Sequence, residues 1–430
     1  MAKEKLNAEL WDKMHYMFRD YNDRMVHVVL SYDYEINIDS LKSNIICFLE
    51  KIPVLHSSFT PNGLDPYWEE KDYTIEDVLT VINEPDDLDT AVEEFIMQYL
   101  PPESPLQIKF AVINKGGKST LCIVENHMCM DGGDLKLFLA TFCEGYTSIE
   151  TEGKSPISKI RSGSRSFEEV YTDMSVAERK AAKDLYKNVS NRDKHAFPFT
   201  DSADSDKSFI AKYKIDKDKF SALRAAGKSL DATVNDVLVA AFIHSLYDVT
   251  DFADSEEIVV SCAIDLRRYI SDLSDVGYTN HTAYMPCSLP GKGRDIKESV
   301  EFAKISARKN KDDKFMGLYG LPLLKLAYNI MPYAASENVI KIGYSNPLLS
   351  MSNIGVLDPV KYSLCGNPPI DGFMTGAVKY KPFMLMSATS LNGELTLCIC
   401  ERGSDADKEI CMNFFKTMDS HFDELIELCK

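Results

Sequence analysis

The stretch ENHMCMDGGDLKLF, residues 125–138, is the most informative part of this 430-residue sequence for its fold and function. It leaves an apolar segment with His127, passes Asp131, turns at Gly132 and Gly133, and continues with Leu and Phe at helical spacing. We therefore expect a strand that ends at His127 and a helix after the glycines. A histidine at a strand end can project into a cleft, where its imidazole accepts and returns a proton near neutral pH. The glycines allow a sharp turn and close packing.

Simpler interpretations of these residues stay open. A lone histidine beside an apolar strand is more often structural, and Asp-Gly-Gly by itself marks an ordinary turn. His127 and Asp131 are also candidate ligands of a metal ion, although no third His or Glu follows at a helpful spacing, so we expect none. Cys129 is an alternative nucleophile, but no cation nearby in the sequence would lower the pKa of its thiol.

Strand and helix patterns alternate on both sides of the motif, as is typical of α/β proteins. Before it, we expect strands at residues 26–34, 106–113 and 120–125, and helices at 37–49 and 88–99. After residue 207, we expect strands at 208–215, 257–264, 281–289, 348–354, 383–390 and 395–401. The helices expected in that part cover residues 217–227, 232–247, 296–309 and 405–428.

One stretch interrupts this alternation. Residues 147–207 are rich in Ser, Thr, Asp, Lys and Gly, with a charged amphipathic helix expected at 167–189. Packed cores rarely contain such a stretch, so we predict an interdomain connection at residues 151–206. The chain then divides into an N-terminal lobe at residues 1–150, which carries the motif, and a C-terminal lobe at residues 207–430.

The composition excludes several classes of function. Lys and Arg number 48 against 66 Asp and Glu, and a net charge of −18 disfavours binding to nucleic acids and anionic membranes. A local basic pocket for one anionic ligand remains compatible with it. No apolar run reaches the roughly 18 residues that span a bilayer. The charged N-terminus lacks a signal-peptide core, and the eleven cysteines form no CxxC pair. We expect a cytoplasmic protein with reduced thiols.

The pattern H-x-x-x-D-G between a strand and a helix, near residue 130 of a two-lobed α/β chain, resembles that of the chloramphenicol-acetyltransferase-like superfamily. Its members include nonribosomal-peptide condensation domains, plant BAHD acyltransferases, wax-ester synthases and alcohol acetyltransferases. Further segments resemble its patterns in the expected order: DATVNDVLVAAF (231–242), SCAIDLRRYI (261–270), VGYTNHTAYMP (276–286), LSMSNIG (349–355) and FMLMSATSLNGELTLCIC (383–400). The whole is most similar to condensation-like and alcohol-acetyltransferase-like members.

Two departures from the superfamily patterns stand out. Many relatives have two adjacent histidines before x-x-x-D-G, whereas this chain has Asn126 in the first place. That first histidine is usually given a supporting role, so its loss does not forbid activity but weakens an assignment to a peptide-synthesis assembly line. The plant-type Asp-Phe-Gly-x-Gly motif is absent, and Ser-Asn-Ile-Gly (352–355) stands at the similar place.

The resemblance implies an active-site tunnel between two lobes, with a thioester donor and an acceptor entering from different faces. His127 would be the general base, which takes a proton from the acceptor hydroxyl or amine and returns it to the departing thiol. This direct route forms no acyl-enzyme. By the same resemblance Asp131 would be structural and pair with Arg267 of the second lobe, with Arg268 as substitute.

The resemblance also nominates substrate-binding residues, without choosing among them. These are Gly132, Asn280, Thr282, Ser352 and Asn353. An apolar acceptor channel has as candidates Met128, Met130, Phe315, Met316, Tyr319, Met351, Phe373 and Met374, all equally compatible with ordinary core positions. A basic group of Lys304, Arg308, Lys309 and Lys311 suits either a phosphopantetheine donor or a solvated helix face. Asn235 and Asp236 match the second-lobe helix, where helix capping is the simpler role.

The sequence thus predicts an acyltransferase that uses acyl-CoA or acyl-phosphopantetheine as a co-substrate and holds no permanent cofactor. Its partners would be the thioester donor, a small-molecule acceptor and, as an option, an acyl or peptidyl carrier protein. We expect a monomer. Two alternatives remain: a catalytically inactive condensation-like binding module, and a metal-dependent hydrolase that uses His127 and Asp131.

Overall fold

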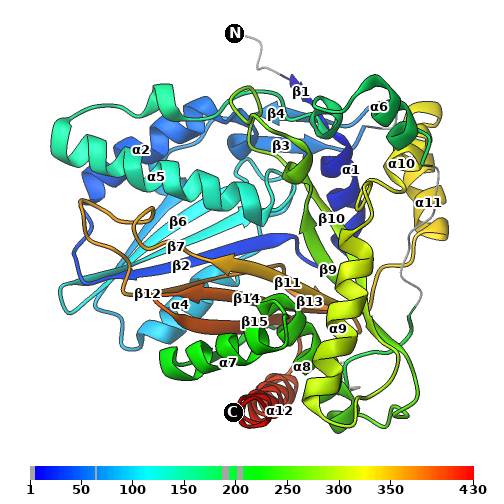
Figure 1. Ribbon diagram of the computed structural model, residues 1–430. Coiled ribbons are helices and arrows are strands. Elements are labelled where there is room, and N and C mark those ends of the chain that lie inside the picture. Colours follow the sequence, from blue (N-terminus) through cyan, green and yellow to red (C-terminus); the bar gives the residue numbers. More distant parts are fainter. Residues whose placement is uncertain (1–4, 63–64, 186–192, 201–206) are drawn as a thin grey trace.

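The computed structural model describes residues 5–62, 65–185, 193–200 and 207–430. Within these residues, two large sheets flanked by helices are accompanied by a small third sheet (Figure 1). One large sheet is built mainly from the N-terminal half of the chain and the other from the C-terminal half. The expected α/β fold with two lobes is confirmed.

The N-terminal sheet has five strands in the order β12, β2, β7, β6, β5. Their bounds are β2 (Met25–Tyr32), β5 (Leu79–Asn83), β6 (Ile108–Lys115), β7 (Lys118–Asn126) and β12 (Asp371–Thr375). Helices α2 (Ile38–Lys51) and α5 (Gly132–Glu152) bury their apolar side chains against one face of this sheet, where the rings of Phe110 and Phe142 stack. Helix α4 (Leu88–Ile96) covers the opposite face with Phe95 and Ile96.

The C-terminal sheet has seven strands in the order β10, β9, β11, β14, β15, β13, with β8 also paired to β15. They are β8 (Ser208–Ile215), β9 (Ile258–Asp265), β10 (Thr282–Leu289), β11 (Leu349–Val356), β13 (Lys379–Tyr380), β14 (Met384–Leu391) and β15 (Glu394–Arg402). The helices that share its core are α7 (Lys217–Ser229), α8 (Val234–Val249), α9 (Ile296–Lys311) and α12 (Asp405–Leu428). No described helix is long and apolar enough to cross a bilayer.

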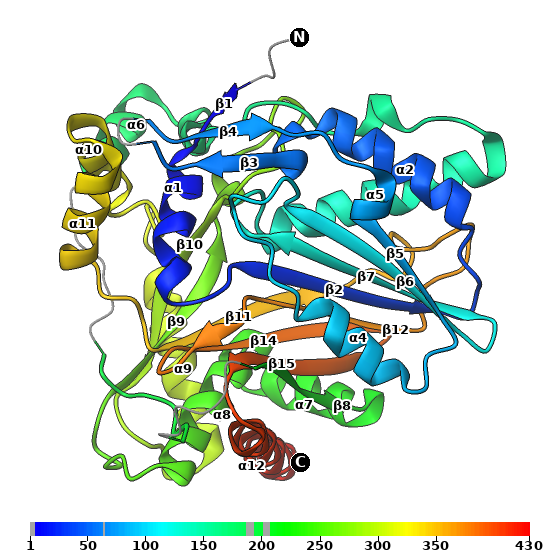
Figure 2. The same ribbon diagram turned by 180° about the vertical axis from the view of Figure 1, so that it is seen from behind.

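The remaining elements lie around one end of the two large sheets (Figure 2). The small sheet joins β1 (Lys5–Asn7), β3 (Ser57–Thr60) and β4 (Tyr67–Glu70). The other helices are α1 (Leu10–Met17), α3 (Ile75–Val78), α6 (Val176–Lys183), α10 (Leu321–Ile330) and α11 (Tyr333–Gly343). A short 3-10 helix, η5 (Leu266–Tyr269), follows β9.

Two elements of the C-terminal half pack with the N-terminal half. Strand β12 lies antiparallel beside β2, with Phe373 opposite Val29. The α10–α11 hairpin packs against α1, where Tyr333 Oη donates a hydrogen bond to the Lys13 carbonyl oxygen. The two halves therefore share a core and do not form separate globules.

Local sequence explains where several helices begin. The Asn37 side chain accepts hydrogen bonds from two backbone amides of the first turn of α2, and Thr233 and Asp236 form a capping box at the start of α8. Capping is thus the role that Asp236 has in the structure. The single helix expected at residues 167–189 is wrong, because Ser175 and Glu178 form a capping box that starts α6 only at Val176. The end of that predicted helix, residues 186–189, lies outside the described residues.

Candidate active site

His127 lies directly after β7, as the strand pattern predicts. Its backbone amide donates a 2.7 Å hydrogen bond to the carbonyl oxygen of Arg24, which precedes β2. Its own carbonyl oxygen accepts a 2.8 Å hydrogen bond from the side-chain amide of Asn280. The preceding Asn126 is fully buried, donates to the Gln107 side chain and accepts from the Met128 amide. Both ends of the short loop are therefore held by hydrogen bonds.

Asn280 determines which nitrogen of His127 is free. Its Nδ2 donates to the carbonyl oxygens of His127 and Met128, so its Oδ1 must be the atom that faces the imidazole. That Oδ1 lies 2.9 Å from His127 Nδ1 and can only accept, so Nδ1 carries the hydrogen. The lone pair then resides on Nε2. Burial lowers the pKa of His127, which keeps the ring neutral and Nε2 basic at neutral pH.

A second imidazole, from His15 on α1, lies against the first. The ring centroids are 4.4 Å apart and the ring planes differ by 24°. Burial and the neighbouring His127 hold the pKa of His15 well below 6.5. The sequence motif gives no sign of His15, because this residue comes from a short helix far from residue 127 in the chain.

Asp131 turns away from His127 and forms an ion pair with Arg267. Arg267 Nη2 lies 2.9 Å and 3.1 Å from the two carboxylate oxygens of Asp131, and both side chains are buried. The Asp131 carboxylate also accepts hydrogen bonds from the Asp134 and His281 amides and from the Thr282 hydroxyl. Although burial alone would raise the pKa of Asp131, the charge of Arg267 and these hydrogen bonds lower it far below its usual range.

Further ion pairs, which the sequence analysis did not anticipate, fasten the motif to the connecting segment. Arg161 Nη1 lies 2.9 Å from Asp134 Oδ1, and Arg267 contacts the other oxygen of the same carboxylate. Arg165 pairs with both oxygens of the buried Asp12 on α1 and donates to the carbonyl oxygens of Met128 and Cys129. Arg161 and Arg165 lie in the Ser- and Gly-rich stretch, and they meet their distant acidic partners only after folding.

The two glycines of the motif have different surroundings. A Cβ atom on Gly133 would lie 2.9 Å from Arg267 Nη1 and 3.1 Å from Asp131 Oδ1, so any larger residue would push against the ion pair. A Cβ atom on Gly132 would meet no atom within 4 Å. Both glycines also border a cavity. The glycine that the packing requires is therefore the second one.

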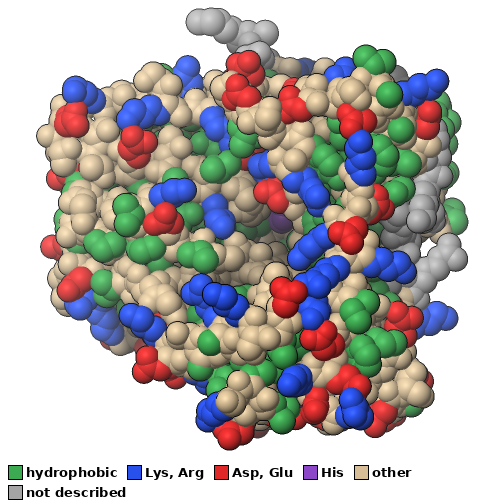
Figure 3. All heavy atoms as spheres, in the orientation of Figure 1, with side chains coloured by type: hydrophobic (Ala, Val, Ile, Leu, Met, Phe, Trp, Pro, Cys, Tyr) green, Lys and Arg blue, Asp and Glu red, His purple; other side chains and the backbone are tan. Residues whose placement is uncertain are grey.

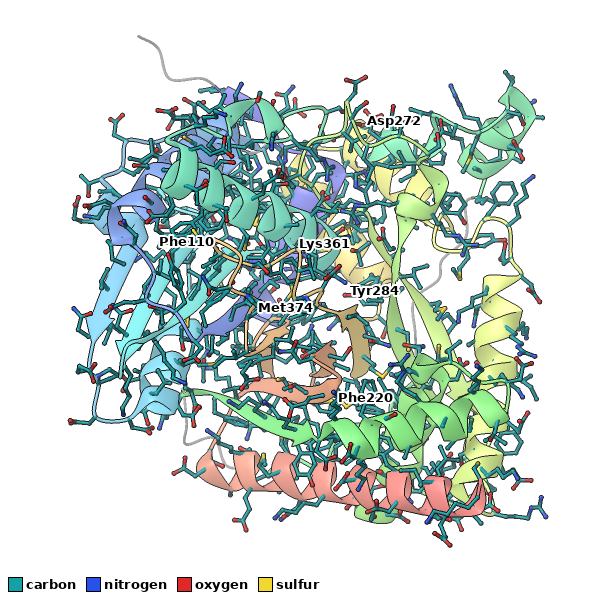
Figure 4. All side chains as sticks on the ribbon, turned by 60° about the vertical axis from the view of Figure 1, so that its left-hand side comes forward. Phe110, Phe220, Asp272, Tyr284, Lys361 and Met374 are labelled. Atoms are coloured by element: carbon teal, nitrogen blue, oxygen red, sulfur yellow. The ribbon has the colours of Figure 1, made fainter. Side chains whose placement is uncertain are left out.

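Two cavities meet at His127. The larger, of about 650 Å³, is lined mainly by apolar residues of α1, β10, α10 and α11. The smaller, of about 230 Å³, reaches the Asp131 loop and strand β11. Both are lined by His15, Phe18, His127, Thr282, Tyr284, Tyr344 and Pro347. Tyr284, labelled in Figure 4 on β10, has 47% of its surface accessible although it lies between the two halves, because the two cavities adjoin it.

The smaller cavity contains most of the substrate-binding residues nominated from the sequence. Four of them border it: Gly132, Thr282, Ser352 and Asn353. Asn280 does not line this cavity and instead contacts Nδ1 of the His127 imidazole. Four cationic side chains border it as well: Arg24, Lys136, Arg267 and Lys379. In the space-filling view, Lys and Arg side chains gather around a hollow between α5 and β10, and a histidine is visible at its floor (Figure 3). Burial and the charge of the exposed Lys361, labelled in Figure 4, lower the pKa of Lys136.

The proposed apolar channel residues separate into two groups. Met316 and Tyr319 line the larger cavity. Phe315 packs against the N-terminal core and lines neither cavity. The others are buried core residues that border neither cavity: Met128, Met130, Met351, Phe373 and Met374 (labelled in Figure 4). The cavity walls come instead from α10 and α11, through side chains such as Leu324 and Ile340.

The structure argues against two of the alternatives that the sequence left open. Cys129 is fully buried, burial raises the pKa of its thiol well above 9, and its Sγ faces the Val54 carbonyl oxygen, so it is no activated nucleophile. Asp131 already accepts hydrogen bonds at both carboxylate oxygens from Arg267 and three other donors, which compete with any metal ion.

The basic group on α9 has intramolecular partners. Lys304 is buried and bonds to Glu301 and to the Leu230 carbonyl oxygen, and Arg308 pairs with Asp231. Lys309 and Lys311 are exposed. None of the four lines either cavity.

The comparisons with known proteins place the fold. No family model and no curated protein matches the sequence. Polyketide synthase associated protein 5 from Mycobacterium tuberculosis is 16% identical with a TM-score of 0.68, over 98% of this chain and 97% of that one. TRI3 trichothecene 15-O-acetyltransferase from Fusarium sporotrichioides is 12% identical with a TM-score of 0.68, over 99% and 95%. The first condensation domain of the CDA synthetase is 13% identical with a TM-score of 0.67, over 100% and 97%. The resemblance predicted from the motifs is confirmed: this chain has the two-lobed condensation and acetyltransferase fold along its whole length.

Proposed function

We propose that this protein transfers an acyl group from a CoA or phosphopantetheine thioester to a hydroxyl or amine acceptor, with His127 as the general base. The observation that carries the proposal is the lone pair of His127 Nε2, which Asn280 leaves free at the junction of two cavities. Two reactants that enter through different cavities would meet at this nitrogen. Similarity in fold to condensation domains and to an acetyltransferase supports the same chemistry.

The reaction needs two proton transfers at His127, one from the acceptor to Nε2 and one from Nε2 to the leaving thiolate. Nε2 takes the proton of the acceptor while its oxygen or nitrogen forms a bond to the thioester carbonyl carbon. When the tetrahedral intermediate collapses, the carbon–sulfur bond breaks and Nε2 returns the proton to the thiolate. The products are the ester or amide and the free thiol, and His127 ends neutral as it began. No acyl-enzyme forms on the way.

The other residues of the motif position this base. Asn280 fixes the tautomer, while the Asp131–Arg267 pair ties the loop of His127 to the C-terminal half. Ser352 and Asn353 supply hydrogen-bond donors at the smaller cavity, where the developing oxyanion needs stabilisation. We assign the apolar larger cavity to a hydrocarbon portion of one substrate.

The test is thiol release from a panel of acyl-CoA and acyl-pantetheine thioesters of increasing chain length, with pooled alcohols and amines. Wild type should release thiol only when an acceptor is present, and His127→Ala should reduce the rate by about 10²–10⁴-fold. Equal rates in the two proteins would remove His127 from the mechanism. Absence of acceptor-dependent thiol release from the whole panel, carrier-bound acyl groups included, would favour the inactive binding module.

A further inference from the structure

Arg24 is a buried arginine that forms no ion pair with a carboxylate in the described part of the chain. Only 1% of its surface is accessible, and it lies just before β2 with a left-handed φ of 63°, where Asn22 Oδ1 accepts a hydrogen bond from its backbone amide. Its Nη2 donates to the Tyr99 hydroxyl at 2.8 Å. Its Nε and Nη1 are buried without any hydrogen-bond partner. An arginine cannot escape this cost by releasing its proton, as a buried histidine or lysine can.

Lys379 brings a second cation to the same place. It begins β13, forms a bridge with Asn22 two residues before Arg24, and lines the smaller cavity together with Arg24 and His127. Among the described residues, no carboxylate oxygen lies within 4 Å of its ammonium group or of the Arg24 guanidinium. Burial lowers the pKa of Lys379 to about 8, an effect that the Glu401 and Asp23 carboxylates oppose only in part.

Two acidic groups, Asp23 and Glu401, act on these cations through space, but among the described residues neither forms an ion pair with them. Asp23 Oδ1 accepts hydrogen bonds from the Met25 and Val378 amides at 2.9 and 3.0 Å, and burial raises its pKa to about 7. Glu401 accepts a hydrogen bond from the amide of Arg402, and burial raises its pKa well above 4.5. The Arg267 cation, in contrast, is surrounded by Asp131, Asp134 and Asp265. Lys136 bonds to the Ile354 carbonyl oxygen, and Arg24 and Lys379 are the other cations of the smaller cavity without an ion pair among the described residues.

We propose that Arg24 and Lys379 form a subsite for an oxyanion, a carboxylate or phosphate, carried by the acyl acceptor. The Arg24 guanidinium has N–H donors without a partner and lies beside the cavity. The oxygens of a carboxylate or phosphate can accept hydrogen bonds from such donors. The inference rests on the proposed acyl transfer, which it narrows to hydroxy or amino compounds with an acidic group near the reacting atom.

The acceptor is the best source of this anion. The phosphates of CoA are separated from the thioester sulfur by the whole pantetheine arm, whereas Arg24 and His127 line one cavity of only about 230 Å³. The hydrocarbon portion of an acyl chain is better suited to the larger cavity, whose walls are mainly apolar. An acidic acceptor that is held at Arg24 would present its nucleophilic atom toward Nε2.

A first experiment separates a ligand-binding arginine from a structural one and needs no turnover. Thermal midpoints are measured in chloride buffer for wild type, Arg24→Met and Arg165→Met, since Arg165 is mostly buried but pairs with Asp12. We expect Arg24→Met to be at least as stable as wild type, because it removes an unpaired charge, and Arg165→Met to be clearly less stable. A loss in Arg24→Met equal to that in Arg165→Met would assign Arg24 to the fold and overturn the subsite.

A second experiment measures anion binding directly. Acetate and inorganic phosphate replace chloride at constant ionic strength, and the general stabilising effect of phosphate is cancelled by comparing wild type with Arg24→Met and Lys379→Met. Wild type should show a saturable rise in its midpoint that is lost in both variants. The same rise in all three proteins would refute an oxyanion site at these residues.

A third experiment tests which substrate carries the anion. Acceptors are compared in pairs that differ only by a carboxylate or its amide, and donors as acetyl-CoA or acetyl-pantetheine. For Arg24→Met we expect at least a tenfold rise in KM for the acid, an unchanged KM for the amide and little change in kcat. If Arg24→Met instead raises KM for acetyl-CoA but not for acetyl-pantetheine or for the acidic acceptor, the anion belongs to the donor. This result would overturn the acceptor assignment. If anions bind in the second experiment but nothing turns over, the proposed function fails while the subsite stands.

Discussion

The imidazole of His15 is stacked on that of His127, with 4.4 Å between the ring centroids. His15 comes from α1 and His127 from the loop after β7, so a helix of the N-terminal segment forms one wall beside the proposed base. Both rings have lowered pKa values and are neutral at pH 7. His15 is therefore a positioning residue in the proposed mechanism, which acts through its contact with the second ring.

The stacked pair predicts different results for two substitutions of His15. His15→Phe keeps an aromatic surface against His127 and should retain most of kcat. His15→Ala leaves a gap that lets the ring of His127 tilt, and kcat should fall about 10- to 100-fold. Steady-state kinetics with one acyl donor checks this. If Ala and Phe are equally harmful, the stack is not what matters, and His15 acts through its own nitrogens.

The pH profile should report the lowered pKa of His127. A base works only when unprotonated, so kcat/KM should fall as the pH drops through a midpoint below 6.5, the ordinary value for histidine. Asn280→Asp places a carboxylate beside Nδ1 and stabilises the imidazolium, which should move the midpoint upward. Asn280→Ala removes the acceptor of Nδ1–H and should lower kcat without that upward shift. An unchanged midpoint in Asn280→Asp would contradict the assigned hydrogen bond.

The Asp131–Arg267 pair should contribute to stability more than to proton transfer. Asp131→Asn keeps a cap for α5 but leaves Arg267 without its main counter-charge, and we expect a loss of about 3–5 kcal/mol in the free energy of unfolding. Denaturant unfolding measures it, and the double variant with Arg267→Met should recover part of the loss. Wild-type stability together with abolished activity in Asp131→Asn would assign the aspartate to the chemistry instead.

The two motif glycines form a matched pair of variants. Gly133→Ala places its Cβ against Arg267 and Asp131, so stability should fall by about 1–3 kcal/mol as the ion pair is displaced. Gly132→Ala meets open space, and its stability should stay within about 0.5 kcal/mol of wild type. Similar losses in both variants would show that chain flexibility in the turn, and not the packing of the pair, requires glycine.

The larger cavity predicts a dependence on chain length. If it holds a hydrocarbon chain, kcat/KM should rise along an acyl or alkyl series. Each buried methylene group should lower the activation free energy by about 0.8 kcal/mol. Ala327→Phe on α10 fills part of the cavity and should flatten this series for the longer members only. Ile342→Phe, at an 89% exposed position of α11 outside the cavity walls, is the control. A flat series in wild type would exclude a hydrocarbon occupant.

Much of the fold follows from local patterns. The amphipathic residues 405–428 follow the helix cap Ser404 and coincide with α12. The turn between β7 and α5 lies where the apolar residues change from alternating to helical spacing. Strand β12 was missed because it has only five residues, one of them Gly372, and these carry little pattern of their own. Short helix α1 was missed for a similar reason.

The candidate site was only partly accessible from the sequence. His127, Asp131 and Arg267 belong to patterns with a fixed spacing. The contacts of Asn280 and His15 with the base, and those of Arg161 and Arg165 with acidic partners, depend on the way in which distant segments meet. The numbers of acidic and basic residues in the sequence could not reveal that Arg24 lacks an ion pair either. This becomes visible only when the positions of the surrounding carboxylates are known.

Strand β12 has a consequence for how the protein is made. The N-terminal sheet lacks its edge strand until residues 371–375 leave the ribosome, long after the histidine motif has been synthesised. Until then the open backbone of β2 is a template for pairing with other nascent chains. Translation rate and chaperone supply should therefore govern the yield of recombinant protein, and fragments that end before residue 371 should aggregate even though they contain the entire histidine motif.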